Sequence, residues 1–369
     1  MEFLLEGLLG ITWKTVVMWA LGALLIYLAI RKEMEPTLLL PIGFGAILVN
    51  IPGVNFGALQ TLYDAGIANE LFPLLLFIGI GAMIDFGPLL SNPKLMIFGA
   101  AAQFGIFLTV LVASFMFPDF KDAASIGIIG AADGPTAILV SQVFKSNYMG
   151  AIAVAAYSYM ALVPIIQPVA IKAVTTKKER QIRMPYNPQS VSRRTRILFP
   201  IIVIVIAGLV APASVSLVGM LMFGNLLREC LKLDSLSQTA QTTLANLITI
   251  VLGLTIAASM KAGAFLTVGT VVIMGLGLVA FVFDTIGGVM FAKLMNLFLP
   301  KDKKINPMVG GAGISAFPMS ARVIQKMALK EDNQNHLLMH AVGANVAGQI
   351  GSVVAGGIIL SLARTFGLL

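Results

Sequence analysis

Two short polar stretches interrupt apolar segments of this chain, and their residue types suit the binding of a small cation. The first is Gly130-Ala-Ala-Asp-Gly-Pro-Thr136, and the second is Gly310-Gly-Ala-Gly-Ile-Ser-Ala-Phe-Pro318. Glycine and proline break helices, and the main-chain carbonyls that a break releases are oxygen ligands of the kind that hard cations prefer. Asp133 adds a negative charge. An intramembrane carboxylate costs about 2.5–3.5 kcal/mol, so it is by default a functional candidate. Asp133 also suits the N-cap of a half-helix that begins at Gly134-Pro135, and the two roles are compatible.

The second stretch offers three polar candidates, which are Asn306, Ser315 and Arg322. Ser315 and Arg322 are seven residues apart and share a face if the stretch is helical. In one interpretation Arg322 binds an anionic substrate or opposes a carboxylate. In the other it extends to the membrane interface beside Lys326.

Further polar residues lie inside apolar segments. Tyr157 and Tyr159 are two apart on one predicted helix, so only one can face the interior, and the spacing does not decide which. A buried tyrosine donates a proton, contributes a hydroxyl ligand, or simply packs. Asp284 is a second acid within an apolar segment, and it serves either a proton path or hydrogen bonds between helices. Asn345 is interpreted first as a residue of close helix packing and second as a site residue.

The composition predicts an integral membrane protein. Of 369 residues, 58% are hydrophobic and 11% are charged, whereas soluble proteins carry about 25% charged residues. The net charge is +8, and eight Lys and Arg residues fall within residues 172–196. A basic segment between apolar ones is typical of a cytoplasmic loop, and this one is too short for a nucleic-acid-binding fold. Two histidines and one cysteine give no metal-site spacing.

Ten apolar segments are long enough to be predicted as membrane spans. They lie near Thr15–Ile30, Thr37–Ile51, Glu70–Leu90, Leu95–Phe117, Met149–Ile171, Ile197–Ala211, Ser214–Leu227, Thr242–Met260, Phe265–Phe291 and Leu337–Leu362. Two more segments, Ala123–Phe144 and Asn306–Ile324, contain the polar stretches and are predicted to be broken or re-entrant.

The two halves of the chain resemble each other. Asn50 and Asn225 differ by 175 positions, and Gly130 and Gly310 differ by 180. If the broken segments return to the side from which they start, five spans per half place most basic residues on one face, which fits the positive-inside rule. An odd number of crossings makes the halves inverted. We therefore predict an all-α fold with a first repeat over residues 1–171, a basic cytoplasmic linker over 172–196 and a second repeat over 197–369.

The two polar stretches also resemble those of a known family, the membrane beta subunits of sodium-pumping, biotin-dependent decarboxylases. The resemblance covers nearly the whole chain. It is most specific in the strings Gly127-Ile-Ile-Gly-Ala-Ala-Asp-Gly-Pro-Thr-Ala137 and Asn306-Pro-Met-Val-Gly-Gly-Ala-Gly-Ile-Ser-Ala-Phe-Pro-Met-Ser-Ala-Arg322.

The resemblance implies decarboxylation of carboxybiotin held by a partner subunit, coupled to outward Na+ transport and consumption of a proton. It assigns catalytic roles to Asp133, Tyr159 and Arg322. Carboxybiotin would meet Arg322, Asn306 and Gly310, and Na+ would meet Asp133, Asn306 and Ser315. The implied partners are a biotin carrier subunit, a carboxyltransferase alpha subunit and a small membrane subunit, around a homo-oligomer in a bacterial inner membrane.

Two other classes of function fit the apolar pattern. One is a sodium-coupled secondary transporter or Na+/H+ antiporter without covalent chemistry, which would depend on a solute rather than on biotin. The other is a membrane anchor for soluble partners, which would tolerate substitution of Asp133.

Overall fold

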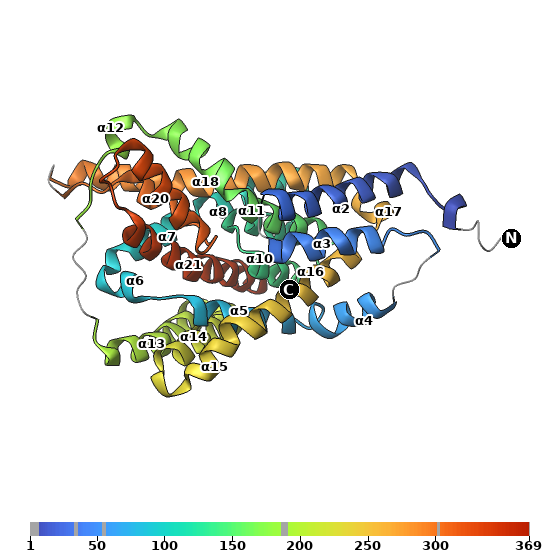
Figure 1. The fold of residues 1–369 in the computed structure, drawn as a ribbon, viewed down its shortest axis with the longest axis horizontal. Coiled ribbons are helices and arrows are strands. Elements are labelled where there is room, and N and C mark those ends of the chain that lie inside the picture. The colour runs from blue at the N-terminus through green and yellow to red at the C-terminus, as the bar shows by residue number, and fades with distance from the viewer. Residues whose placement is uncertain (1–6, 33–35, 54–56, 186–190, 301–302, 369) are drawn as a thin grey trace.

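The chain is helical throughout the part that the computed structural model describes, which is residues 7–32, 36–53, 57–185, 191–300 and 303–368 (Figure 1). The helices of the first half are α2 (Trp13–Lys32), α3 (Pro36–Leu48), α4 (Gly57–Gly66), α5 (Leu71–Met83), α6 (Gly87–Ser91), α7 (Met96–Ala102), α8 (Phe104–Met116), α9 (Phe120–Gly127), α10 (Gly134–Val143) and α11 (Met149–Val174). Those of the second half are α12 (Lys177–Arg180), α13 (Arg193–Val210), α14 (Val215–Glu229), α15 (Asp234–Thr239), α16 (Ala245–Ile256), α17 (Ala262–Phe265), α18 (Val268–Phe298), α19 (Pro307–Gly311), α20 (Met319–Glu331) and α21 (Leu338–Thr365).

Within the described ranges, six helical segments are long and apolar enough to cross a membrane, or seven if the bent pair α4 and α5 counts as one span. This confirms a multi-pass membrane protein but is fewer than the ten predicted spans. The segments that fall short are helical: α3 has 13 residues and α14 has 15, while α13 has 18 but begins with the basic run Arg193-Arg194-Thr-Arg196. The segment predicted over Glu70–Leu90 is not one helix, because α5 ends at Met83 and the separate short helix α6 begins at Gly87.

Both polar stretches interrupt helices, as predicted. In the first, α9 passes into a 3₁₀ turn at Ile128–Ala131, Ala132 adopts a left-handed conformation with φ of 52°, and α10 starts at Gly134. In the second, α19 ends at Gly311 and α20 starts at Met319, so residues 312–318 form an irregular connection. Two breaks far apart in sequence thereby bring free main-chain groups into the helical bundle.

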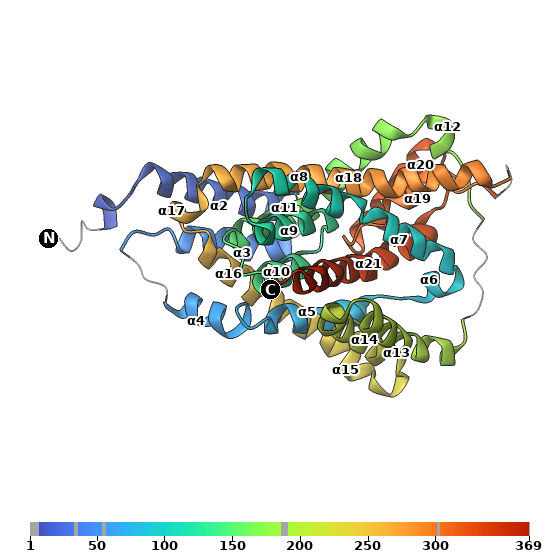
Figure 2. The same cartoon turned by 180° about the vertical axis from the view of Figure 1, so that it is seen from behind.

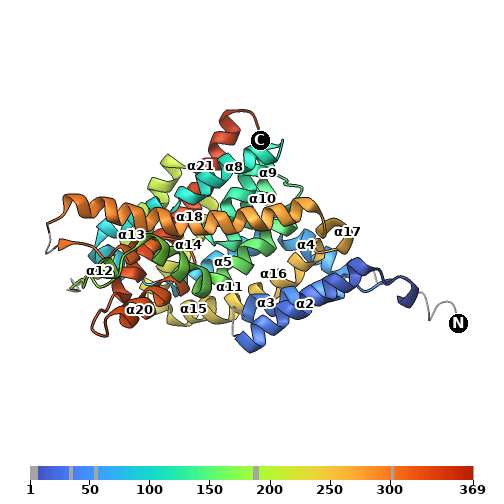
Figure 3. The ribbon, with the colours of Figure 1, turned by 90° about the horizontal axis from the view of Figure 1, so that it is seen from above.

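Helix α18 is the element against which both broken stretches pack. It runs along the length of the molecule in Figure 2 and Figure 3, and it contacts α8, α11, α19 and the 3₁₀ turn of the first break. Gly288 of α18 meets Gly310 of α19 so closely that a Cβ on either residue would collide with the carbonyl of the other. Glycine at both positions therefore allows the two backbones to touch.

Candidate functional site

The carboxylate of Asp133 is the centre of a buried polar cluster. Its side chain is 3% exposed, and Oδ2 accepts hydrogen bonds from four side chains. The hydroxyls of Thr136 and Ser352 lie 2.7 and 2.8 Å away, while Ser315 Oγ and Gln349 Nε2 lie at 3.2 Å. A buried carboxylate is costly without such donors, so these four hydrogen bonds compensate the burial of Asp133.

Three separate parts of the fold supply these groups. Asp133 is the N-cap of α10, and its Oδ1 accepts from the main-chain N–H of Thr136 at 3.4 Å, so the predicted cap is confirmed. Ser315 lies in the irregular connection after α19, and its own N–H donates to the Ala131 carbonyl at 3.0 Å. The two broken stretches are therefore joined by main chain as well as by side chains.

A cavity of about 300 Å³ opens beside Asp133. Its polar lining comes from both halves of the chain and includes Tyr157, Asn246, Thr249, Ser315 and Gln349. Hydroxyl, amide and carboxylate oxygens are the ligands that a hard monovalent cation takes, and a cavity of this size holds an ion with some of its water.

Two residues of this cluster were not predicted from the sequence. Gln349 and Ser352 follow Asn345 at spacings of four and three on α21, which places all three on one helical face. Asn345 donates to the Ile314 carbonyl at 2.6 Å, and its Oδ1 has no hydrogen-bond partner among the described residues. The signal in the sequence was the spacing of Asn345, Gln349 and Ser352, which places three polar side chains on one face of an otherwise apolar helix.

The two tyrosines of α11 are both buried, so the expectation that only one faces the interior is wrong, but their surroundings differ. Tyr157 lines the cavity beside Asp133, its ring packs against Gly134, and its hydroxyl has no hydrogen-bond partner within the described part of the chain. Tyr159 points toward α18, where its ring packs against Gly277 and its hydroxyl donates to the Met274 carbonyl. The structure thus brings Tyr157, and not Tyr159, to the cavity.

Asn306 and Gly310 lie apart from the Asp133 cluster. The Asn306 amide donates at 2.8 Å to the carbonyls of both Arg180 and Ile182, and its Oδ1 accepts from the Met308 N–H at 3.1 Å. These bonds attach the basic segment to the start of α19. Gly310, as described above, forms the close contact with α18.

Two arginines in the middle of the basic segment form ion pairs outside the membrane spans. Arg180 pairs with Glu331 at 2.8 Å, and Arg183 pairs with Asp332 at 2.6 Å. The hydrogen bond from the Arg183 guanidinium lowers the pKa of Asp332 below its ordinary value, and the N–H of Gln334 adds to this effect. The connection between α20 and α21 is thereby fixed to the segment that follows α11.

Arg322 and Ser315 do not share a helical face. The prediction required a continuous helix, but α20 starts only at Met319, after Ser315. Ser315 is buried against Asp133, whereas Arg322 is exposed on α20 and forms no ion pair among the described residues.

Asp284 is the second buried acid, at 1% exposure on α18. Its Oδ1 accepts from the Ile106 N–H at 3.0 Å at the start of α8, and its Oδ2, which has no hydrogen-bond partner in the described ranges, faces Gly130. It joins α8, α18 and the first break, so hydrogen bonding between elements is its observed role.

Known proteins resemble this chain over nearly its full length. The family model of the Na+-transporting oxaloacetate decarboxylase beta subunit matches residues 14–363. The methylmalonyl-CoA decarboxylase subunit beta of Propionigenium modestum is 48% identical, with 96% of both chains covered. The glutaconyl-CoA decarboxylase subunit beta of Acidaminococcus fermentans is also 48% identical, over 97% of this chain and 95% of the relative. The oxaloacetate decarboxylase beta chain of Klebsiella pneumoniae is 44% identical, over 96% of both. The chain therefore belongs to the family of membrane beta subunits of Na+-transporting decarboxylases.

Proposed function

We propose that this beta subunit binds Na+ at Asp133 and couples its outward transport to the decarboxylation of carboxybiotin. The observation that carries the proposal is the convergence of Thr136, Ser315, Gln349 and Ser352 on one buried carboxylate beside a polar cavity. Rotating hydroxyls can turn their lone pairs toward a cation, so the groups that now stabilise the carboxylate also serve as ligands.

The chemistry requires a proton. When the N–CO2 bond of carboxybiotin breaks, the electron pair stays on the ureido nitrogen, which then takes up a proton. Tyr159 is the proposed donor, and its hydroxyl has to leave the Met274 carbonyl to act. Arg322 is the proposed contact for the carboxylate of carboxybiotin. It is exposed on α20, and Glu331 in the last turn of that helix pairs with Arg180 of the basic segment. The biotin would arrive on a carrier subunit loaded by a carboxyltransferase alpha subunit, in a complex with a small membrane subunit at a bacterial inner membrane.

In our proposal, Asn306 and Gly310 support this chemistry by holding the second broken stretch in position. Both polar atoms of the Asn306 side chain are engaged with main chain, so this side chain holds the broken stretch in place rather than facing an ion in this state. Gly310 lets that stretch approach α18.

The proposal includes two inverted repeats, residues 1–171 and 197–369, joined by the linker 172–196, of which residues 186–190 lie outside the described ranges. Reciprocal contacts support this arrangement. Asn50 of the first half donates to the Met260 carbonyl of the second at 2.8 Å, and Asn225 of the second donates to the Ile84 carbonyl of the first at 3.2 Å. In the same way α3 packs on α16 while α14 packs on α5, and α11 packs on α18 while α21 packs on α7.

The test is CO2 release from free carboxybiotin by the reconstituted complex, with and without Na+, for the native protein and for Asp133→Asn. We expect Na+-stimulated release that is lost in the variant. Asp122→Asn is the matched control, because Asp122 is also buried and accepts from Ser146 Oγ and the Asn147 N–H, but it lies outside the cavity. Undiminished Na+-dependent turnover in Asp133→Asn would contradict the site. Transport without any CO2 release would instead favour a secondary transporter.

A further inference from the structure

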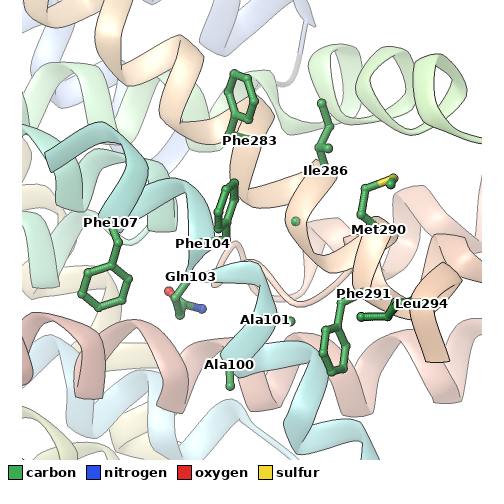
Figure 4. Close-up of a pocket in the computed structure, with 11 residues that line it drawn as sticks. Ala100, Ala101, Gln103, Phe104, Phe107, Phe283, Ile286, Met290, Phe291 and Leu294 are labelled. Atoms are coloured by element: carbon green, nitrogen blue, oxygen red, sulfur yellow. The ribbon is translucent and has the colours of Figure 1, made fainter. Parts of the chain in front are cut away.

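A large apolar groove lies on the outer side of the bundle, away from Asp133. It has a volume of about 680 Å³, with α7 and α8 as one wall and α18 as the other (Figure 4). Gln103 is the only polar side chain among its lining residues, and its Nε2 donates to the Gly99 carbonyl at 2.7 Å.

The groove is open to the surroundings of the protein. Phe104 is 53% exposed and Leu294 is 49% exposed, on opposite walls. Both walls belong to helical segments long and apolar enough to span the membrane. The medium that these side chains meet is therefore lipid acyl chain rather than water.

The groove leads directly into a second hollow. This hollow, of about 380 Å³, shares Met290 and Leu294 with the groove and is otherwise lined by residues near the basic segment. Its charged residues are Glu179, Lys293 and Lys304. Lys293 Nζ lies 3.1 Å from Glu179 Oε1 and donates to the Val174 carbonyl at 2.9 Å, whereas Lys304 takes part in no ion pair with any described residue. The hollow thus carries one positive charge in excess.

Along α18 the charged hollow is followed by the apolar groove, in the same order as the headgroup and the acyl chains of a phospholipid. The lysines lie at the end of the span, on the side of the basic segment, and the apolar groove extends from Leu294 to Phe283 toward the middle of the helix. Eleven residues of helix rise about 16 Å, which is the length of the groove along α18. This length is close to half the hydrocarbon thickness of a bilayer, about 15 Å.

From this arrangement we infer that the groove and hollow bind one anionic phospholipid of the leaflet on the basic-segment side. Its phosphate lies between Lys293 and Lys304, and an acyl chain lies along α18 against Phe104. Basic pockets between membrane helices on the cytoplasmic side bind acidic headgroups in this way. A partner helix fits less well, since the hollow offers cations where such a helix would need an acidic residue at its end.

The experiment measures lipid retained by the purified complex after reconstitution in vesicles of equal parts phosphatidylglycerol and phosphatidylcholine, with native mass spectrometry as the readout. We expect phosphatidylglycerol to be retained in preference, and Lys293→Gln and Lys304→Gln each to reduce that preference about fivefold. Lys303→Gln is the matched control, because Lys303 is exposed and lines neither hollow. Ala101→Phe, which fills the groove, is expected to remove the bound lipid of either kind.

Glu179→Gln separates headgroup binding from a structural effect. Both Glu179→Gln and Lys293→Gln break the same ion pair, so a structural role would shift lipid retention in the same direction. A headgroup site predicts opposite directions, with stronger retention of phosphatidylglycerol in Glu179→Gln because a negative charge is removed. Equal retention of both lipids by the native complex would overturn the inference. The inference would also be overturned if inorganic phosphate occupied the hollow while the groove held no acyl chain. A cross-linking experiment that places a partner subunit in the groove would overturn it as well.

Discussion

Ser315 Oγ donates a hydrogen bond to Asp133 Oδ2 at 3.2 Å, which joins residues 182 positions apart in the sequence. One belongs to each broken stretch, so the two interruptions form a single site. The main-chain bond from Ser315 N–H to the Ala131 carbonyl holds them in this register.

Ser315→Ala is expected to raise the Na+ concentration for half-maximal CO2 release about fivefold to tenfold, because one oxygen ligand and one hydrogen bond are lost. The maximal rate should change less. The control is Ser141→Ala, since Ser141 is equally buried but its hydroxyl donates only to the Ala137 carbonyl of its own helix. An unchanged Na+ dependence in Ser315→Ala would remove this residue from the ion site.

Ser315 and Ser352 should act together. Their hydroxyls lie 3.1 Å apart and both contact Asp133 Oδ2. The effect of the double alanine variant on Na+ dependence is therefore expected to differ from the sum of the single effects by at least about 0.5 kcal/mol. Strict additivity in a double-mutant cycle would show that the two hydroxyls do not share an ion.

Tyr157→Phe and Tyr159→Phe form a matched pair on one helix. If Tyr159 is the proton donor, Tyr159→Phe loses about 10²–10⁴-fold in CO2 release at saturating Na+. Tyr157→Phe should instead keep the maximal rate and shift the Na+ dependence, because its hydroxyl lines the cavity. The opposite pattern in the same assay would transfer the donor role to Tyr157.

Asn306→Ala is expected to destabilise the protein by about 1–3 kcal/mol, because the N-cap bond to the Met308 N–H and both bonds to the Arg180 and Ile182 carbonyls are lost, and Asn335 then remains as the side-chain donor to these carbonyls. The segment after α11 should become more sensitive to trypsin, which is measured on the reconstituted protein. Asn296→Ala is the comparison, since Asn296 bonds only to Ile305 and leaves the basic segment attached. A large change in Na+ affinity with unchanged proteolysis would indicate that Asn306 is an ion ligand instead.

Arg322→Leu should weaken the use of carboxybiotin without changing the stability of the protein. Arg322 is exposed and forms no ion pair within the described ranges, so its removal is expected to alter the free energy of unfolding by less than about 0.5 kcal/mol. The KM for free carboxybiotin is the measurement, and Lys326→Leu, one turn further on the same helix, is the control. An equal effect of both variants would indicate general attraction by the basic face.

The sequence predicted the breaks and the N-cap position of Asp133 because both follow from local chemistry. Glycine and proline end helices wherever they occur in such runs, and an aspartate before Gly134-Pro135 is a cap in any context. The orientation of α11 was not predictable, because it depends on how Gly134 and Gly277 admit the rings of Tyr157 and Tyr159. The partners of Asn306 were also inaccessible, since they lie more than 120 positions earlier in the chain. Fewer helices than the ten predicted spans are long and apolar enough to cross, because hydropathy alone does not register that α3, α5 and α14 are short or that α13 starts with a basic run.

Asp133 is the only residue with an acidic or basic side chain among those that line the cavity. In the proposed site a single monovalent ion neutralises the ionised carboxylate of Asp133, whereas the ionised carboxylate without an ion carries a full negative charge. Moving a bare charge through the membrane interior costs several times the thermal energy, and moving a neutral pair does not incur that cost. If Asp133 binds the ion as proposed, the same carboxylate opposes reorientation of the unloaded protein, and we expect it to limit slippage of the pump.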